Sequence, residues 1–207
     1  MMLKRTISDG SWVIHQPAFL DHDQQRSLQE HLITTLPWEQ PDIMMFGKAV
    51  KIPRLQAWIG DPDAHYRWSG KTFVPSPWTP VLKALTDDLN QQLNTQFNSV
   101  LINWYRSGDD SMGWHSDDEK ELGPNPTIAS LSLGEPRTFK LRERHKTSPQ
   151  NLNYALGNGD LFVMGGATQS HWRHCVVKTR KSVQARLNLT FRDINPERHE
   201  TTTPRTN

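Results

Sequence analysis

The sequence predicts a mainly β protein with flanking helices (α+β), whose strands form an antiparallel sandwich or barrel. After residue 96, short apolar segments alternate with turn residues at a spacing that is typical of antiparallel sheets. Before residue 96, two segments repeat leucine at the spacing of an amphipathic helix. A jelly roll is one architecture that fits such a succession of strands.

Each of the two predicted helices begins at a recognisable capping residue. Asp21 and Gln24 form a capping-box-like pair at the start of the first helix. Thr79 can cap the second helix, with Pro80 at its first position. The apolar positions that follow are Leu28, Leu32 and Leu36 in the first helix and Leu82, Leu85, Leu89 and Leu93 in the second. Both helices are expected to pack this stripe against another part of the protein.

The remaining segments are interpreted as strands, hairpins and a tail. Residues 38–78 are rich in Trp and Pro and predict short strands and hairpins. Beyond residue 96 the predicted strands are SVLINWY, TIASLSL, RTFKL, LNYAL, DLFVM, HCVV and RLNLTFR. The chain is therefore expected to form one structural domain with three parts. Residues 1–96 come first, and residues 97–193 hold these strands. Residues 194–207 are a polar segment that is expected to be disordered.

The composition is that of an ordinary globular chain without membrane or disulfide features. Of 207 residues, 35% are hydrophobic and 22% are charged, and no run of eighteen apolar residues predicts a membrane span. The first ten residues lack the apolar segment of a secretory signal. Cys175 is the single cysteine, which excludes an intramolecular disulfide and a zinc site made of several thiolates. We expect a cytoplasmic protein, nucleoid-associated if the source is bacterial, with no membrane partner.

Two clusters of basic residues stand out against a net charge of only +2. They are KLRERHK (residues 140–146) and KTRK (residues 178–181). Such runs usually form solvated faces, whereas contact with the phosphates of a nucleic acid is the more specific alternative.

A metal site is the first functional hypothesis. His115 and Asp117 are two residues apart, so on an extended segment their side chains point to the same side, roughly 7 Å apart along the backbone. A third ligand would come from SHWRHC (residues 170–175), where His171 and His174 face opposite sides of an extended chain, so at most one of them can join. Two imidazoles and one carboxylate are the ligand set of non-haem Fe(II) oxygenases, and zinc is the competing metal.

The last predicted strand, RLNLTFR, carries polar side chains on one face. Arg186, Asn188, Thr190 and Arg192 alternate there with Leu187, Leu189 and Phe191. On an edge strand this polar face would be solvated. Inside the sandwich two guanidinium groups would be costly unless they met anions, and a small dicarboxylate would satisfy both. In LINWY, Asn103 and Tyr105 also share one face and are either structural hydrogen-bonding groups or further ligands.

These motifs occur in one order along the chain. The set Asn103-x-Tyr105, His115-x-Asp117, His174 and Arg186-x-Asn188-x-Thr190-x-Arg192 closely resembles the AlkB family of Fe(II)- and 2-oxoglutarate-dependent dioxygenases. The resemblance extends from about residue 42 to residue 192, and RLNLTFR is a very specific part of it. It implies a double-stranded β-helix, which is a jelly-roll variant, with a nucleotide-recognition lid in residues 1–96.

The resemblance also implies a role for each residue of the motifs. It makes His115, Asp117 and His174 the Fe(II) ligands, because His174 lies twelve residues before Arg186, as in close relatives, whereas His171 belongs to the preceding turn. It assigns 2-oxoglutarate binding to Asn103, Tyr105, Arg186, Asn188 and Arg192. We expect Arg186 at the distal carboxylate and Arg192 at the keto-acid end, with O2 as the second co-substrate.

The segments FGKAVKIPRLQAWIGD, YRWSG and PWTPVL resemble the DNA-repair branch of the family, which includes double-strand-acting homologues. Tyr66 and Trp68 match positions that line the base pocket in relatives, and burial in a hairpin core is the alternative. Phe46 matches a wedge that enters the duplex, and the alternative is that Met44 to Phe46 form an exposed apolar liability or an anchor to the core. Glu119 matches an acid near the exocyclic amine of the target base, and a solvated loop acid is the alternative. Arg54, together with residues 140–146, is expected to hold phosphates.

The sequence departs from the family pattern at two positions. Residue 104 is Trp where many relatives have Arg, but it lies on the face opposite Asn103 and Tyr105. Residue 68 is Trp where close relatives carry Phe, which puts the preferred lesion in question.

The implied function is oxidative demethylation of N-alkylated bases, namely 1-methyladenine and 3-methylcytosine, with release of formaldehyde, succinate and CO2. The expected partner is alkylated duplex DNA, and the expected state is a monomer. The alternatives are the same chemistry on RNA or protein, and a non-catalytic jelly-roll binding module.

Overall fold

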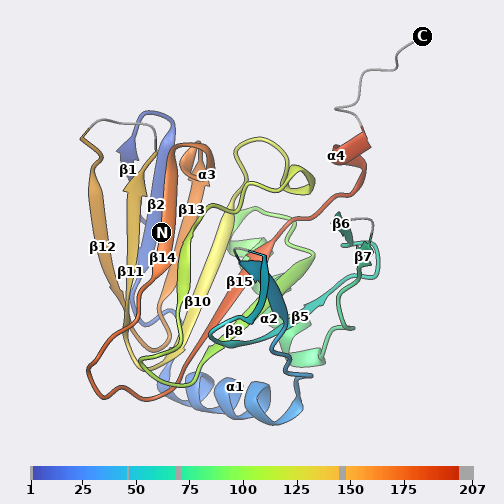
Figure 1. Cartoon of the computed structure of the whole chain (residues 1–207), viewed down its shortest axis with the longest axis vertical. Coiled ribbons are helices and arrows are strands. Elements are labelled where there is room, and N and C mark those ends of the chain that lie inside the picture. The colour runs from blue at the N-terminus through green and yellow to red at the C-terminus, as the bar shows by residue number, and fades with distance from the viewer. Residues whose placement is uncertain (1, 46, 69–70, 145–147, 201–207) are drawn as a thin grey trace.

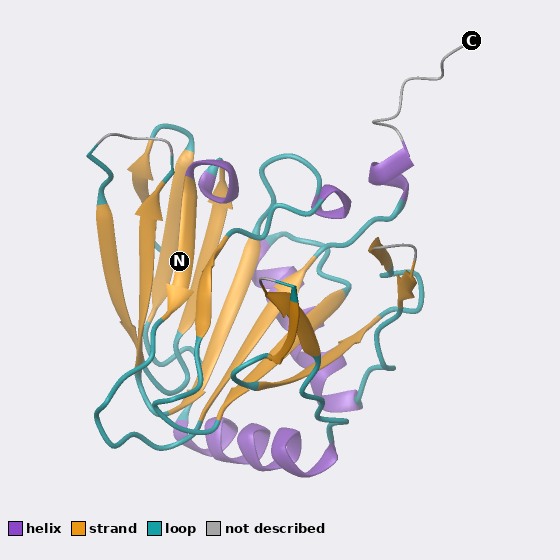
Figure 2. Ribbon diagram, viewed as in Figure 1, coloured by secondary structure: helices purple, strands orange, loops and turns teal. Residues whose placement is uncertain are grey.

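The computed structural model consists of two facing antiparallel sheets, two long helices and two hairpins (Figures 1 and 2). It describes residues 2–45, 47–68, 71–144 and 148–200, with the side chains of 45, 66–68, 71–72 and 199–200 left out. Every pairing between named strands is antiparallel. The expected jelly-roll core with flanking helices is therefore confirmed. Among the described residues, no helix is both long and apolar enough to cross a membrane.

The strands and helices have the following bounds. The seven-stranded sheet has the order β1 (Lys4–Ser8), β2 (Ser11–Gln16), β13 (Leu161–Gly166), β10 (Ile128–Gly134), β15 (Arg186–Arg192), β8 (Ser99–Tyr105) and β5 (Leu55–Gly60). The four-stranded sheet has the order β12 (Asn151–Leu156), β11 (Arg137–Glu143), β14 (Trp172–Val176) and β9 (Met112–His115). The hairpins are β3 (Asp42–Met45) with β4 (Lys48–Lys51), and β6 (Tyr66–Trp68) with β7 (Lys71–Phe73). The helices are α1 (His22–Thr35), α2 (Pro80–Leu93), α3 (Thr168–His171), α4 (Glu197–Glu200) and the 3-10 turn η1 (Lys120–Leu122).

Both long helices begin where their caps predict. The Asp21 carboxylate accepts a hydrogen bond from the backbone N–H of Gln24, whose side chain accepts one from the Asp21 N–H, so α1 has a complete capping box. The Thr79 hydroxyl accepts from the Leu82 N–H at the start of α2, and Asn94 ends that helix in the left-handed conformation at φ 51°. These caps satisfy backbone groups that would otherwise lack partners at the helix ends.

Two apolar layers cover the two faces of the seven-stranded sheet. The outer layer joins Leu32 of α1 and Leu89 of α2 to strand residues such as Leu189. The inner layer lies between the sheets and joins Phe162 of the large sheet to Leu141 and Trp172 of the small one. Because both faces are covered, a central strand of this sheet has no solvent-exposed side.

The position of β15 decides how its polar face is interpreted. This strand pairs with β10 on one side and with β8 on the other, so the edge-strand alternative is wrong. Leu187, Leu189 and Phe191 belong to the layer beneath the helices, and the alternating polar residues therefore face the interior between the sheets. Arg186 is only 1% exposed there.

Some elements were not predicted from the sequence. β1 and β2, which were not predicted, extend the large sheet beside β13. β5 lies in the region predicted to form short strands, and its pairing with β8 was not predicted. Residues 1–96 therefore supply three strands to the large sheet. The described part of the tail is packed and not disordered: Ile194 is 6% exposed, and the backbone N–H of Asn195 donates to the Glu121 carbonyl. Residues 201–207 lie outside the described residues.

Candidate metal centre and co-substrate pocket

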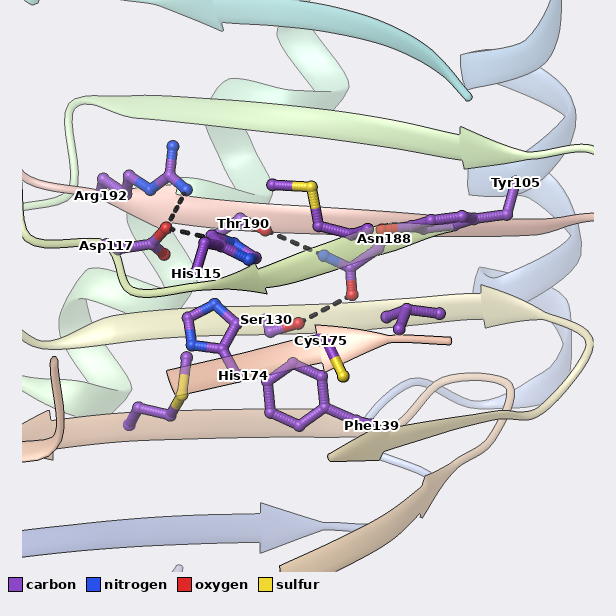
Figure 3. A pocket seen from close by; sticks show the side chains of 13 residues that line it. Tyr105, His115, Asp117, Ser130, Phe139, His174, Cys175, Asn188, Thr190 and Arg192 are labelled. Carbon is purple, nitrogen blue, oxygen red and sulfur yellow. Dashed lines mark hydrogen bonds and ion pairs between the residues drawn. The ribbon is translucent and has the colours of Figure 1, made fainter. Parts of the chain in front are cut away.

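Three potential metal ligands meet at one end of the small sheet. His115 ends β9 and is the register partner of His174 on the neighbouring strand β14, while Asp117 follows two residues later. One ligand atom from each of the three residues lies within 4.8 Å of the others. The two imidazole rings have centroids 4.2 Å apart, and their side chains lie close to Asp117 in the same pocket (Figure 3). The structure therefore brings together the three residues that the sequence singled out.

The neighbouring histidine is excluded from this cluster. His171 is the last residue of α3 and is exposed, with its Nδ1 3.4 Å from the Ser11 hydroxyl. His174 is 4% exposed and points into the interior from the strand that follows. The segment SHWRHC is thus helical through His171 and extended from Trp172 onward, so the two imidazoles lie on different elements.

The protonation states suit a divalent metal. Burial, followed by the neighbouring His115, lowers the pKa of His174 to about 3. Burial also lowers the pKa of His115. For Asp117, burial favours the neutral acid, but Arg192 and the two imidazoles outweigh it and lower the pKa to about 2. Near neutral pH the cluster therefore offers two neutral imidazoles and a carboxylate, which are the forms that bind metals.

Arg192 lies beside this cluster. Its Nη2 donates to Asp117 Oδ1 at 2.8 Å, and its side chain is largely buried. The sequence placed Arg192 at the keto-acid end of 2-oxoglutarate, and the structure places it next to the residues expected to hold the metal. Asp117 thus has a fixed orientation through a charge-assisted hydrogen bond.

Arg186 occupies the other end of the same strand. Its Nη2 donates to Ser132 Oγ at 2.9 Å and to Asn188 Oδ1 at 2.8 Å, and its guanidinium lies 5.5 Å from the centre of the Tyr105 ring. Its Nε and Nη1 are buried and have no hydrogen-bond partner among the described residues. Burial lowers its pKa to about 10.

The unsatisfied Nε and Nη1 groups of Arg186 indicate that a carboxylate fits the site. A buried cation with N–H groups that lack acceptors is costly, and a bound anion removes that cost. The donor set at the other end, two imidazoles and a carboxylate, suits Fe(II). The residues present therefore fit both Fe(II) and an acid whose far carboxylate reaches Arg186.

A narrow pocket lies between the histidine cluster and the polar face of β15. One wall is polar and includes Asn188, Thr190 and Arg192, and the facing wall includes Phe139 and Cys175 (Figure 3). The amide of Asn188 is fixed because its Oδ1 accepts from Ser130 and its Nδ2 donates to Thr190. Tyr105 also lines the pocket, at the end opposite Asp117 in the view of Figure 3.

The expected phosphate contact by Arg54 needs correction. Arg54 is 7% exposed, and its Nε donates to Asn103 Oδ1 at 2.7 Å while its Nη1 donates to the Ser111 carbonyl. Its guanidinium is therefore directed inward and orients Asn103, one of the residues expected to bind 2-oxoglutarate. A cation in this position is not available to phosphates at the surface.

The residues expected to recognise the base are only partly described. Phe46 lies outside the described residues. Tyr66 and Trp68 belong to β6, but their side chains also lie outside the described part. Glu119 is exposed immediately before η1. Of residues 140–146, Lys140 and Arg142 lie on the outer face of the small sheet, and 145–146 are not described.

Several residues of the site were missed by the sequence analysis. Ser130 and Ser132 of β10 bind Asn188 and Arg186, and Gln169 of α3 binds the backbone of Asp117. The alternation in SLSL was a usable signal for the two serines, because small polar residues at every second position of a central strand need partners on the same interior face.

The two histidines of SHWRHC can be separated by metal binding. We expect His174→Ala to abolish measurable Co(II) binding at micromolar protein, because it removes one of three ligands, whereas His171→Ala should bind Co(II) as the wild type does. Anaerobic titration followed by visible absorption measures both. Equal loss in the two variants would contradict the assignment.

Acid should destabilise the metal-free protein through the same cluster. Because His174 has a folded-state pKa of about 3 against an ordinary 6.5, the unfolded chain binds more protons below pH 6.5, and the free energy of unfolding falls as the pH decreases. Through this group alone, the free energy of unfolding can fall by at most about 1.4 kcal/mol per pH unit. Asp117 adds a loss only as the pH falls from 3.8 through about 2. Urea unfolding at pH 7, 6 and 5 measures the free energy of unfolding at each pH. This free energy should decrease less steeply with falling pH in His174→Gln than in the wild type. An equal dependence on pH in the two proteins would contradict the prediction.

Comparisons with known proteins agree with this geometry. A family model described as "2OG-Fe(II) oxygenase superfamily" matches residues 13–192. The human and mouse proteins named "Alpha-ketoglutarate-dependent dioxygenase alkB homolog 3" are each 39% identical over 189 residues, which cover 87% of this chain and 65% of theirs. The mouse protein named "DNA oxidative demethylase ALKBH2" is 38% identical over 160 residues, which cover 74% of this chain and 67% of that protein. The chain thus spans about two thirds or slightly less of the length of these relatives.

A solved structure gives the same fold. The structure titled "The structure of OsALKBH1" superposes with a TM-score of 0.64 at 21% identity, and the match covers 91% of this chain and 100% of that one. At this identity the likeness concerns the fold alone. The family model and the relatives above show more than the fold: the chain belongs to the AlkB family of the 2OG-Fe(II) oxygenase superfamily.

Proposed function

We propose that this chain is an Fe(II)- and 2-oxoglutarate-dependent oxidative demethylase that acts on N-alkylated bases of nucleic acids. The observation that carries the proposal is the arrangement along β15: a buried guanidinium that needs an anion at one end and a cluster of two histidines and an aspartate at the other. Relatives named as dioxygenases and as DNA oxidative demethylases support it.

His115, Asp117 and His174 would hold Fe(II), and Arg186 with Tyr105 would receive the distal carboxylate of 2-oxoglutarate. When bound there, Fe(II) and 2-oxoglutarate supply the activation of O2 and the hydroxylation of an N-methyl carbon, which yields the free base, formaldehyde, succinate and CO2.

The protein's own contribution is orientation and exclusion of water. Arg192 fixes the Asp117 carboxylate, and Arg186 is itself aimed by Ser132 and Asn188. The apolar wall, which includes Phe139, Met164 and Val176, limits the number of water molecules that can enter beside the co-substrate. The neutral imidazoles need no deprotonation before they bind the metal, because their pKa values are already lowered.

A basic surface supports a nucleic acid as the partner. On the outer face of the small sheet, Arg142 of β11 lies directly opposite Arg173 of β14, with Lys140 two residues along. None of the three forms an ion pair with an acid in the described part of the chain, and Arg142 lies over the exposed Trp114 ring at 5.4 Å. Like charges that face each other across strands are destabilising, and a polyanion removes this cost.

The motifs of the sequence and a relative named as a DNA oxidative demethylase support a more specific proposal for the substrate. We propose 1-methyladenine and 3-methylcytosine in duplex DNA, acted on by a monomer. The β3–β4 hairpin exposes Ile43, Met44 and Val50, the last two 68% and 44% exposed, and an exposed apolar hairpin is suited to entering a base stack.

Reconstitution tests the proposed reaction. Protein loaded anaerobically with Fe(II) and 2-oxoglutarate, then exposed to O2 with an oligonucleotide that carries 1-methyladenine or 3-methylcytosine, should release one formaldehyde per repaired base. The Asp117→Ala variant and an unmethylated oligonucleotide are the controls, and duplex DNA, single-stranded DNA and RNA are compared. Absence of turnover on every alkylated nucleic acid, in protein that binds the metal, would refute the substrate class.

Salt dependence tests the basic surface. Replacing Arg142 and Arg173 with alanine removes two proposed phosphate contacts, so the slope of log K against log salt for duplex DNA should become shallower by about 1.8. The matched control replaces Arg26 and Lys83, two exposed cations on α1 and α2 that already pair with Asp23 and Asp87. An equal change of slope in both double variants would show that general charge, and not this surface, governs binding.

A further inference from the structure

The loop that carries Asp117 is fastened to the short helix α3. The backbone N–H of Asp117 donates to Oε1 of Gln169 at 2.9 Å, across 52 residues of sequence. Gln169 is 1% exposed and Asp117 is 2% exposed, so the bond is fully desolvated. The other end of the same amide, Nε2, lies 3.6 Å from the sulfur of Met164, which lines the pocket. A single buried side chain thus links the ligand loop to the wall of the site.

A second set of bonds supports the same loop from outside. The Ser116 hydroxyl donates to the Trp172 carbonyl at 2.8 Å. Arg144 donates from Nη1 to Asp118 Oδ2 at 2.8 Å and to the backbone carbonyl of Gln169 at 3.2 Å. The residues before and after Asp117 therefore have partners of their own, and Gln169 alone among the described side chains binds the backbone N–H of Asp117 itself.

Gln169 also lies three residues before Trp172, the first residue of the strand that carries the third ligand. α3 ends at His171, and β14 begins at Trp172 and bears His174. The amide of Gln169 consequently links two segments whose ligands are 57 residues apart in sequence. We propose that Gln169 is a positioning residue of the metal centre, which holds the Asp117 carboxylate at the correct distance from His174. This inference rests on the proposed function, in that the three ligands bind a divalent metal.

The chemistry of the site explains why an amide suits this position. The Asp117 N–H needs an acceptor, and a carboxylate there would add a second negative charge beside Asp117. Leucine has a similar volume but no acceptor, so Gln169→Leu leaves a buried N–H unsatisfied and releases the loop. Loss of a hydrogen-bonding partner that orients a metal ligand usually lowers the metal affinity by about ten-fold or more.

The test uses the whole chain and Co(II) as the probe. Gln169→Leu is compared with Thr168→Val, a change at the preceding residue of α3, whose hydroxyl bonds the Gly165 carbonyl and the Trp12 backbone and does not touch the loop. Two quantities are measured: amide hydrogen exchange at Asp117 in the metal-free protein, and the Kd and visible absorption bands of Co(II).

The expected result is faster exchange at Asp117, a Kd raised about ten-fold and altered absorption bands in Gln169→Leu, with Thr168→Val within two-fold of the wild type in both measurements. A Kd for Gln169→Leu within two-fold of the wild type would overturn the inference, as would equal changes in the two variants. Failure of the wild type to bind Co(II) would instead refute the metal centre, and exchange at Asp117 would still decide whether Gln169 fixes the loop.

Discussion

The burial of one guanidinium group, that of Arg186, is the constraint on which the rest of the site depends. β15 lies between β10 and β8, and its polar residues face the interior between the two sheets, where Arg186 is 1% exposed. A cation in that position requires hydrogen-bond acceptors, and Ser132 and Asn188 provide only part of them. The fold thus creates a need for an anion at one fixed point between the two sheets.

The same strand register places the metal ligands at a fixed distance from that point. Arg186 and Arg192 are six residues apart on one strand, roughly 20 Å along the backbone, and Arg192 contacts Asp117 at the far end. His115 and His174 face each other across β9 and β14. Because these residues sit on or next to paired strands, the site has the rigidity that positioned chemistry requires. The exposed hairpin β3–β4 lies outside these two sheets.

Much of this arrangement could be predicted where local patterns decide the structure. The alternation in RLNLTFR and SVLINWY predicted the bounds of β15 and β8 and which of their residues share a face, and the caps predicted the starts of α1 and α2. β1 and β2 were not predicted because their residues show no regular alternation of apolar and polar side chains. Arg54 was misassigned because only the pairing of β5 with β8 brings it to Asn103. Gln169 was missed for a similar reason, since its partner is 52 residues away and depends on how α3 packs.

We expect a metal at His115, Asp117 and His174 and, at the other end of the polar face of β15, a carboxylate of the co-substrate at Arg186. A crystal structure of the protein with Mn(II) and 2-oxoglutarate, grown without O2, tests it most directly. We expect Mn(II) bound to those three side chains and the distal carboxylate of 2-oxoglutarate within hydrogen-bonding distance of Arg186 Nε or Nη1. Metal bound elsewhere, or a distal carboxylate that does not contact Arg186, would contradict it.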